Sequence, residues 1–265
     1  MKLDGCNALI TGASAGIGRE FARQLAGRAK SLILIARRDQ RLNELRDELE
    51  QQYPNLVVFA RKSDLADLVR LNELLAWLDH ETIDIDLLIN NAGLGDSGAF
   101  VTSDPVRNEQ MTLVNIVALT ILTRHLLPQM IAKRHGGILN VSSSAGFLPI
   151  PDFAVYAATK AYVTSFSEAL RAELREKSVS VCALCPGPVH TEFQDVAKRP
   201  GAQPDTGPGF VFVPVEEVVR DALAALEADR PLVIPGFPMK LGMFLIRITP
   251  LPILRLLARF SPRRG

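Results

Sequence analysis

Short apolar runs alternate with helical patterns along most of this 265-residue chain, and that alternation restricts the fold more than any other feature. Each run is nearly continuous in apolar residues, which is typical of strands buried on both faces of a parallel sheet. The segments between them repeat apolar residues at helical spacing, so the sequence predicts successive βαβ units in one domain. The expected strands span residues 7–11, 31–35, 56–61, 85–89, 137–142, 179–185 and 232–234.

A glycine-rich turn follows the first expected strand. It reads Gly12-Ala13-Ser14-Ala15-Gly16-Ile17-Gly18 and leads into a helical pattern. Such a turn directs backbone N–H groups and a helix N-terminus toward a phosphate, and its glycines let a pyrophosphate approach closely. The spacing departs from G-x-G-x-x-G, so the turn taken alone is also compatible with a simple connection between two elements.

Two arginines, Arg37 and Arg38, follow the second expected strand, where an acidic residue would bind the adenosine ribose hydroxyls of NAD. Because arginine accommodates a 2′-phosphate at this position, the pair favours NADP(H) over NAD(H). The alternative is a solvated pair at the start of a helix. Asp64 and Leu65 follow the third expected strand, and the Asp64 carboxylate is placed to bind an adenine amine.

Tyr156 and Lys160 are four residues apart in an expected helix over about residues 153–177. This spacing puts both side chains on one face of the helix. A nearby ammonium favours the phenolate, so we expect Lys160 to lower the pKa of Tyr156 into a useful acid/base range. Ser143 ends the preceding strand, and its hydroxyl is placed to hold a substrate oxygen. The alternative is a half-buried tyrosine beside a solvated lysine.

Asn115 interrupts the apolar face of a long expected helix. A buried asparagine needs hydrogen-bond partners, and a backbone carbonyl would serve. That structural role is compatible with a catalytic one, so both remain open at this point.

The order of these motifs is more specific than any one of them. Taken together they resemble the classical short-chain dehydrogenase/reductase family over about residues 3–235. The resemblance rests on Thr11-Gly12-x-x-x-Gly16-Ile17-Gly18, Asn90-Asn91-Ala92-Gly93, Asn115, Ser143, Tyr156-x-x-x-Lys160 and Pro186-Gly187. It implies a Rossmann-type, doubly wound sheet of seven parallel strands in a three-layer α/β/α domain.

The resemblance also implies a catalytic tetrad of Asn115, Ser143, Tyr156 and Lys160. In it Tyr156 is the general acid or base, Lys160 lowers its pKa and holds the nicotinamide ribose, Ser143 positions the substrate oxygen, and Asn115 holds a water. The 2′-phosphate would meet Ser14, Arg37 and Arg38, and the carboxamide would meet Thr191 and the Val189 backbone. Further expected cofactor contacts are Gly12, Ala15, Gly16, Ile17, Gly18, Asp64, Leu65, Asn91, Ala92, Gly93, Pro186 and Gly187.

The expected dinucleotide-binding domain covers residues 1–238. Within it, a loop rich in proline and glycine at about 187–214 is the candidate substrate lid. Candidate substrate-facing residues are nearly all apolar, which predicts a hydrophobic carbonyl or secondary alcohol. They are Leu94, Phe147, Leu148, Ile150 and Phe153, with the aromatic residues of the loop.

Residues 239–265 form an expected basic and apolar extension that contains no acidic residue. Such a composition is compatible with an interfacial membrane helix. We favour a substrate lid or a subunit contact, with peripheral membrane contact as the alternative. The tail also resembles those of ketoacyl-CoA reductases and of a branch of bacterial short-chain dehydrogenases, although less specifically than the core motifs.

Bulk properties exclude other classes of protein. A net charge of +1 gives no reason to expect nucleic acid as a partner. Three cysteines favour a reducing compartment, hence a cytoplasmic protein, and Cys182 and Cys185 are expected as core thiols rather than a metal or redox pair. No metal is expected. The family's usual states predict a homodimer or homotetramer.

The sequence therefore predicts an NADP(H)-dependent oxidoreductase that acts on an apolar carbonyl/alcohol pair. A 3-oxoacyl thioester reductase is the alternative among enzymes. A nucleotide-sensing module that binds NADP(H) without turnover is the alternative from another class, although such a binder has no need of the full tetrad.

Overall fold

A parallel sheet forms the centre of the computed structural model, which describes residues 1–199, 212–250 and 252–253. Its order is β3-β2-β1-β4-β5-β6-β7, and every neighbouring pair is parallel. The predicted seven-stranded, doubly wound fold is confirmed. The strands are β1 (Asn7–Thr11), β2 (Ser31–Ala36), β3 (Val57–Lys62), β4 (Leu87–Asn90), β5 (Gly136–Val141), β6 (Val179–Leu184) and β7 (Leu232–Val233).

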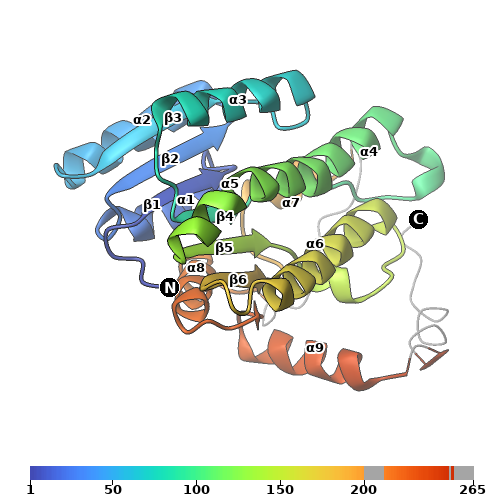
Figure 1. Cartoon of the computed structure of the whole chain (residues 1–265). Coiled ribbons are helices and arrows are strands. Elements are labelled where there is room, and N and C mark those ends of the chain that lie inside the picture. Colours follow the sequence, from blue (N-terminus) through green and yellow to red (C-terminus); the bar gives the residue numbers. More distant parts are fainter. Residues whose placement is uncertain (200–211, 251, 254–265) are drawn as a thin grey trace.

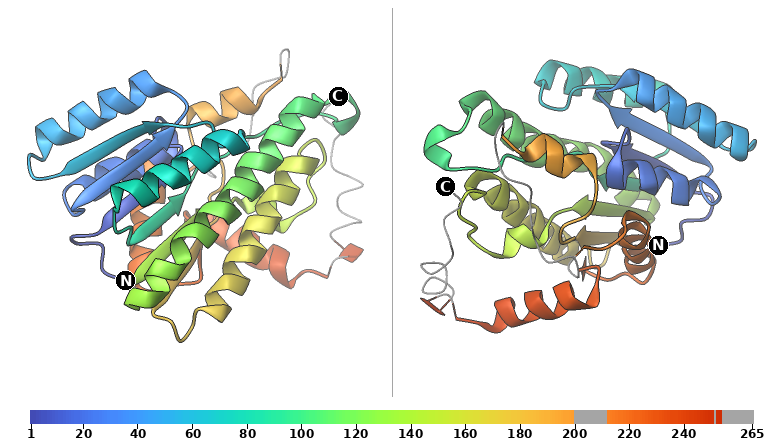
Figure 2. Two further views of the ribbon diagram at one scale, coloured as in Figure 1. Left: turned by 45° about the horizontal axis from the view of Figure 1, so that its top comes forward. Right: turned by 180° about the vertical axis from the view of Figure 1, so that it is seen from behind.

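Helices cover both faces of the sheet and give the three layers visible in Figures 1 and 2. One apolar core joins the sheet to α1 (Gly16–Ala26), α2 (Asp39–Gln52) and α8 (Val215–Glu227). The other joins it to α3 (Leu68–Glu81), α5 (Leu119–Lys133) and α6 (Ala154–Glu173). Successive strand residues point to opposite cores, as with Ala8 and Leu9, because side chains alternate across a strand.

The direction of winding changes between β1 and β4, since β1 pairs with β2 on one side and with β4 on the other. In open parallel sheets, ligands bind at such a switch point, outside the carboxyl ends of the strands. The glycine-rich turn follows β1 here, and residues 91–93 follow β4. The topology therefore brings the two segments together at the edge where a dinucleotide would lie.

Residues 105–133 form one continuous helix from α4 (Pro105–Thr112), the π-helix η2 (Leu113–Ala118) and α5. By length and composition alone this helix would suit a membrane span. Its buried side chains, including Met111, Leu122 and Met130, pack in the core shared with the sheet, which is typical of a core helix in a globular domain.

The segment expected as a loop over 187–214 contains a short helix, α7 (Glu192–Ala197), and its residues 200–211 lie outside the described part of the chain. The last described helix is α9 (Phe237–Ile248), which lies at the bottom of Figure 1. The boundary expected after Pro238 falls in the first turn of α9. Most of the tail beyond it, residues 251 and 254–265, is outside the described residues.

Candidate active site

Tyr156 and Lys160 lie on one face of α6, as their spacing predicts. The Lys160 side chain is only 4% exposed, and its Nζ donates a hydrogen bond to the Val141 carbonyl at 2.8 Å. The same Nζ lies 5.7 Å from the centre of the Tyr156 ring. The end of β5 therefore fixes the lysine beside the half-buried phenol.

Burial shifts both groups toward their neutral forms. It raises the pKa of Tyr156 to about 12, and hydrogen bonding to the Ser143 hydroxyl opposes that rise. It also lowers the pKa of Lys160 to about 8. The expectation that Lys160 lowers the Tyr156 pKa is therefore not met in the cofactor-free protein, because loss of hydration outweighs any effect of the ammonium.

Replacement of Lys160 by methionine should change how stability depends on pH. The pKa of Lys160 falls from 10.5 to about 8 on folding, so the unfolded chain binds more protons between these values and wild-type stability rises with pH there. Between pH 7.5 and 9.5, the free energy of unfolding of wild type should rise by about 2 kcal/mol more than that of Lys160→Met. Urea unfolding of the cofactor-free proteins measures this, and parallel pH profiles would contradict it.

Ser143 directly follows β5 and caps the short helix η3 (Ser144–Phe147), where its Oγ accepts a hydrogen bond from the Ala145 amide at 3.1 Å. Gly146 lies against the α6 backbone: a Cβ there would be 2.7 Å from the Lys160 carbonyl carbon. Main-chain packing thus places the serine loop against the helix that carries Tyr156.

Asn115 lies in η2 and is 1% exposed. Its Nδ2 donates to the Leu94 carbonyl and to Thr159 Oγ1, both at 2.9 Å, and its Oδ1 accepts from the Leu94 amide at 2.8 Å. A Cβ on Gly93 would lie 3.5 Å from both Asn115 Oδ1 and Lys160 Nζ. The structure therefore gathers all four expected tetrad residues at the carboxyl ends of β4 and β5. Thr159, which links Asn115 to α6, was not predicted.

The glycine-rich turn fits closely against the end of β4. Gly12 has a φ of +68°, and a Cβ there would lie 2.9 Å from Ala92 Cα. A Cβ on Gly18 would overlap the Gly12 carbonyl oxygen and Asn91 Nδ2. Asn91 Nδ2 in turn donates to the Thr11 carbonyl at 2.9 Å. Asn91, which was expected to contact the cofactor, therefore holds the glycine-rich turn through its side chain.

The segment after β6 closes over the same turn. A Cβ on Gly16 would lie 3.2 Å from Thr191, and one on Gly187 would lie 2.6 Å from Met239 Cε of α9. The Pro186 carbonyl accepts from the Ser144 amide at 2.9 Å, and Val189 is buried. The expected nicotinamide-side residues thus lie beside both the glycine turn and the serine loop.

Arg38 donates from Nε to the buried Ser14 Oγ at 3.2 Å and pairs with Glu192 at 2.7 Å. Arg41 also pairs with Glu192 at 2.7 Å. Arg37 makes none of these contacts. Burial lowers the pKa of Arg107, and the positive charge of Arg37 lowers it further. Sequence reasoning missed Arg41 and Glu192, because their contact joins residues far apart in the chain and leaves no local signal.

The expected adenine-side residues, Asp64 and Leu65, lie just beyond β3, which ends at Lys62. Asp64 Oδ1 accepts from the Ala66 amide at 3.0 Å, and Leu65 is buried in a core.

The two cysteines of the C-x-x-C sequence, Cys182 and Cys185, are fully buried free thiols, and burial raises the pKa of each.

Aromatic side chains surround the Tyr156 ring. The ring centre of Phe193, in α7, is 5.6 Å away, and that of Phe153 is 6.3 Å away. The Arg247 guanidinium of α9 lies 5.5 Å from the centre of the Phe147 ring, which belongs to η3. Leu94 is buried nearby. The site is therefore lined largely by apolar groups and flanked by both α7 and α9.

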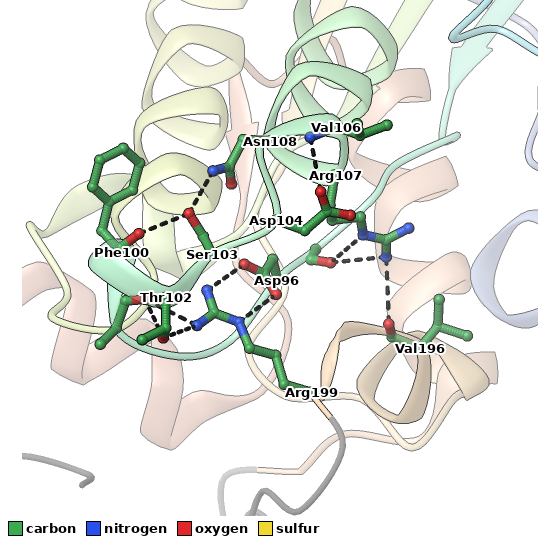
Figure 3. A network of polar contacts seen from close by, with 12 residues as sticks. Asp96, Phe100, Thr102, Ser103, Asp104, Val106, Arg107, Asn108, Val196 and Arg199 are labelled. Atoms are coloured by element: carbon green, nitrogen blue, oxygen red, sulfur yellow. Dashed lines mark hydrogen bonds and ion pairs between the residues drawn. The ribbon is translucent and has the colours of Figure 1, made fainter.

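A polar network holds α7 against the segment after β4 (Figure 3). Arg199 pairs with Asp96 at 2.6 Å and donates to the Ala99 carbonyl at 2.9 Å. Arg107 donates to the Gly95 carbonyl at 2.9 Å and to the Val196 carbonyl at 3.3 Å. Neither arginine was predicted as part of the site.

Comparisons with known proteins find similar sequences and similar structures. A family model described as short chain dehydrogenase matches residues 6–200. The NADP-dependent 3-hydroxy acid dehydrogenase of Schizosaccharomyces pombe is 39% identical over 198 residues, which cover 74% of this chain and 76% of that protein. A short-chain dehydrogenase from Sphingobium yanoikuyae, solved with NADPH, has a TM-score of 0.82 at 30% identity and 98% coverage of both chains. The bulky-bulky ketone specific alcohol dehydrogenase from Comamonas testosteroni has a TM-score of 0.76 at 28% identity, over 98% of this chain and 96% of that one.

Proposed function

Because this chain belongs to the short-chain dehydrogenase family of oxidoreductases, we propose that it interconverts an apolar carbonyl compound and its secondary alcohol with NADP(H). The observation that carries the proposal is the convergence of Ser143, Tyr156 and Lys160 beside the glycine-rich turn. When bound, the nicotinamide supplies or accepts the hydride, and the protein supplies orientation and proton transfer.

The residues present fit a phosphorylated dinucleotide. A Cβ on Gly12 or Gly18 would meet Asn91 and neighbouring backbone, so only glycines let the turn pack this tightly at the start of α1. A glycine turn at a helix N-terminus offers its backbone N–H groups to a pyrophosphate. Ser14, Arg38 and Arg41 offer a hydroxyl and two guanidinium groups within one cluster, as a 2′-phosphate requires. The NADP-dependent relative and the NADPH complex support the same cofactor for this chain.

In the proposed mechanism, the Tyr156 hydroxyl donates a proton to the carbonyl oxygen during reduction and accepts it back during oxidation. Ser143 Oγ holds the same oxygen. Lys160 binds the nicotinamide ribose and favours the phenolate when charged, while Asn115 fixes the backbone at Leu94 and holds a water beside Lys160. Thr191 and the Val189 backbone would orient the carboxamide.

An uncharged, apolar substrate is favoured over a 3-hydroxy acid. Phe153 and Phe193 flank the phenol, and these rings would contact a hydrophobic group. The nearby arginines Arg199 and Arg107 are already engaged, the first by Asp96 and the second by backbone carbonyls. Arg247 lies over the Phe147 ring and pairs with Glu168 at 3.5 Å. A substrate carboxylate would therefore have to break existing interactions. The relative that acts on bulky-bulky ketones supports this substrate class.

The direct test is consumption of NADPH and NADH across a panel of bulky ketones, aldehydes, 3-oxoacyl thioesters and 3-oxo acids. Turnover of bulky ketones with NADPH supports the proposal. Turnover confined to thioesters would replace the apolar ketone with the 3-oxoacyl substrate. Tight NADPH binding without turnover of any compound would favour the nucleotide-sensing module instead.

For α9 we propose the role of a wall of the substrate site in a cytoplasmic homodimer or homotetramer. Met239 contacts Gly187, Met243 is buried, and Arg247 covers Phe147, so the inner face of α9 lies against the site. Apolar residues also remain exposed along the helix and are available for contact with another surface. They are Phe237, Leu241, Phe244, Leu245 and Ile248.

Deletion of the residues after Pro238 should raise the KM for the substrate by roughly tenfold, because the Met239, Met243 and Arg247 side chains that close the site are lost. Steady-state kinetics, light scattering and sedimentation with anionic liposomes would be measured on the same preparation. A change in oligomer size with unchanged kinetics would favour the subunit contact. Unchanged size and kinetics, with liposome binding lost, would identify a membrane contact instead.

A further inference from the structure

Glu192 is the first residue of α7. Its carboxylate bridges two arginines that lie near the start of α2. It accepts hydrogen bonds from Arg38 at 2.7 Å and from Arg41 at 2.7 and 2.8 Å. Arg38 directly precedes α2, and Arg41 lies in the first turn of that helix. The two guanidinium groups hold the pKa of the Glu192 carboxyl below its usual range, so the bridge is ionic at neutral pH.

This bridge uses the donors that the proposed function assigns to a 2′-phosphate. Arg38 contacts the Ser14 hydroxyl at the same time as it contacts Glu192. Guanidinium groups bind carboxylate and phosphate oxygens in the same forked geometry. Glu192 and a 2′-phosphate therefore compete for one set of donors, and both cannot occupy it without placing like charges side by side.

This inference rests on the proposed NADP(H) site. We propose that Glu192 is a specificity-determining residue, because a 2′-phosphate must displace its carboxylate from Arg38 and Arg41. It lowers affinity for the phosphorylated cofactor, and it leaves a cofactor without the 2′-phosphate unaffected. Glu192→Gln therefore widens the preference for NADP(H) over NAD(H).

The next residue links this competition to the reacting end of the site. Phe193 follows Glu192 directly and lies 5.6 Å from Tyr156, ring centre to ring centre. A Cβ on Gly95 would lie 2.8 Å from Phe193 Cζ, so the ring is closely packed on that side. Release of Glu192 by a 2′-phosphate frees one contact of the first turn of α7, which carries the phenylalanine beside the Tyr156 ring. The far end of α7 stays anchored by Arg107 and Arg199 (Figure 3).

Two nucleotides that differ only in the 2′-phosphate test the proposal, namely adenosine 2′,5′-bisphosphate and AMP. Calorimetry would compare their affinities for wild type, Glu192→Gln and Asp195→Asn. The control residue lies on the same short helix, is largely exposed, and pairs with Lys198 rather than with the arginines. We expect Glu192→Gln to bind the bisphosphate about fivefold more tightly and AMP equally, and Asp195→Asn to match wild type.

Hydrogen exchange of residues 192–197 supplies a second readout without turnover. The bisphosphate should speed amide exchange there in wild type, whereas AMP should not. Unchanged bisphosphate affinity in Glu192→Gln, or an equal gain for AMP, would overturn the proposal. Arg38→Ala distinguishes the phosphate site from the competition with Glu192. If Arg38→Ala weakens bisphosphate binding while Glu192→Gln has no effect, the phosphate site stands and only the competition fails. Full bisphosphate binding by Arg38→Ala would overturn both.

Discussion

Replacement of Tyr156 by phenylalanine is expected to lower kcat for carbonyl reduction by roughly a thousandfold, because the proposed proton donor is lost. The fold and the affinity for NADPH should be retained. The ring would keep its packing against Phe153 and Phe193, and only one hydroxyl is removed. Activity of the variant would be followed with NADPH and a substrate from the panel, alongside its thermal midpoint and NADPH titration.

Tyr162→Phe is the matched control. Tyr162 lies on the same helix, stacks on Phe166, and shares a hydrogen bond with Thr120 Oγ1 at 2.9 Å. It therefore loses a comparable hydroxyl away from the reacting groups, and its activity should stay within about twofold of wild type. Retention of a tenth or more of wild-type activity by Tyr156→Phe would refute the assignment of the tyrosine as proton donor.

Replacement of Gly18 by alanine is expected to destabilise the protein by about 3 kcal/mol and to abolish measurable NADPH binding. The new methyl group would overlap the Gly12 carbonyl oxygen and lie 2.8 Å from its carbon. The Gly12 atoms are backbone, so no side-chain rotation relieves that overlap, and movement of Asn91 Nδ2 on the other side would break its hydrogen bond to the Thr11 carbonyl. Urea unfolding and NADPH titration measure the two effects separately.

Gly242→Ala provides the opposite outcome from the same chemical change. Gly242 lies inside α9, and a Cβ there meets no atom of the described residues within 4 Å. Because alanine is the better helix former, this variant should be up to ~1 kcal/mol more stable. Near-normal stability and cofactor binding in Gly18→Ala would show that the turn has room that the structure does not give it.

The sequence alone was enough to predict the parts of the site that depend on local spacing or on the ends of strands. Tyr156 and Lys160 share a helix face because they are four residues apart, and the glycine turn follows β1 because strand, turn and helix are contiguous. The parallel sheet then brings the ends of β4 and β5 to the same edge. These features are set by short stretches of chain, and the seven-stranded fold followed from them together with the family resemblance.

Other parts of the site depend on contacts between distant segments and had no local signal. The bridge from Glu192 to Arg41 joins residues 151 apart, and the packing of Met239 on Gly187 arises only once α9 has docked. The pKa shifts of Tyr156 and Lys160 were missed for a related reason. They depend on how deeply each side chain is buried, which a spacing of four residues does not reveal.

The place of β4 beside β1 has a consequence for the order of assembly. Thr11 Oγ1 accepts hydrogen bonds from the Asn91 and Ala92 amides at 3.0 and 2.9 Å, and these contacts span about eighty residues. Closing so long a segment is entropically unfavourable and belongs to the slower part of folding. During synthesis, the glycine turn emerges early but lacks its facing wall until residues 91–93 have been made. The nucleotide can therefore stabilise the chain only once β4 has paired with β1, and it cannot serve as a template for the first βαβ unit.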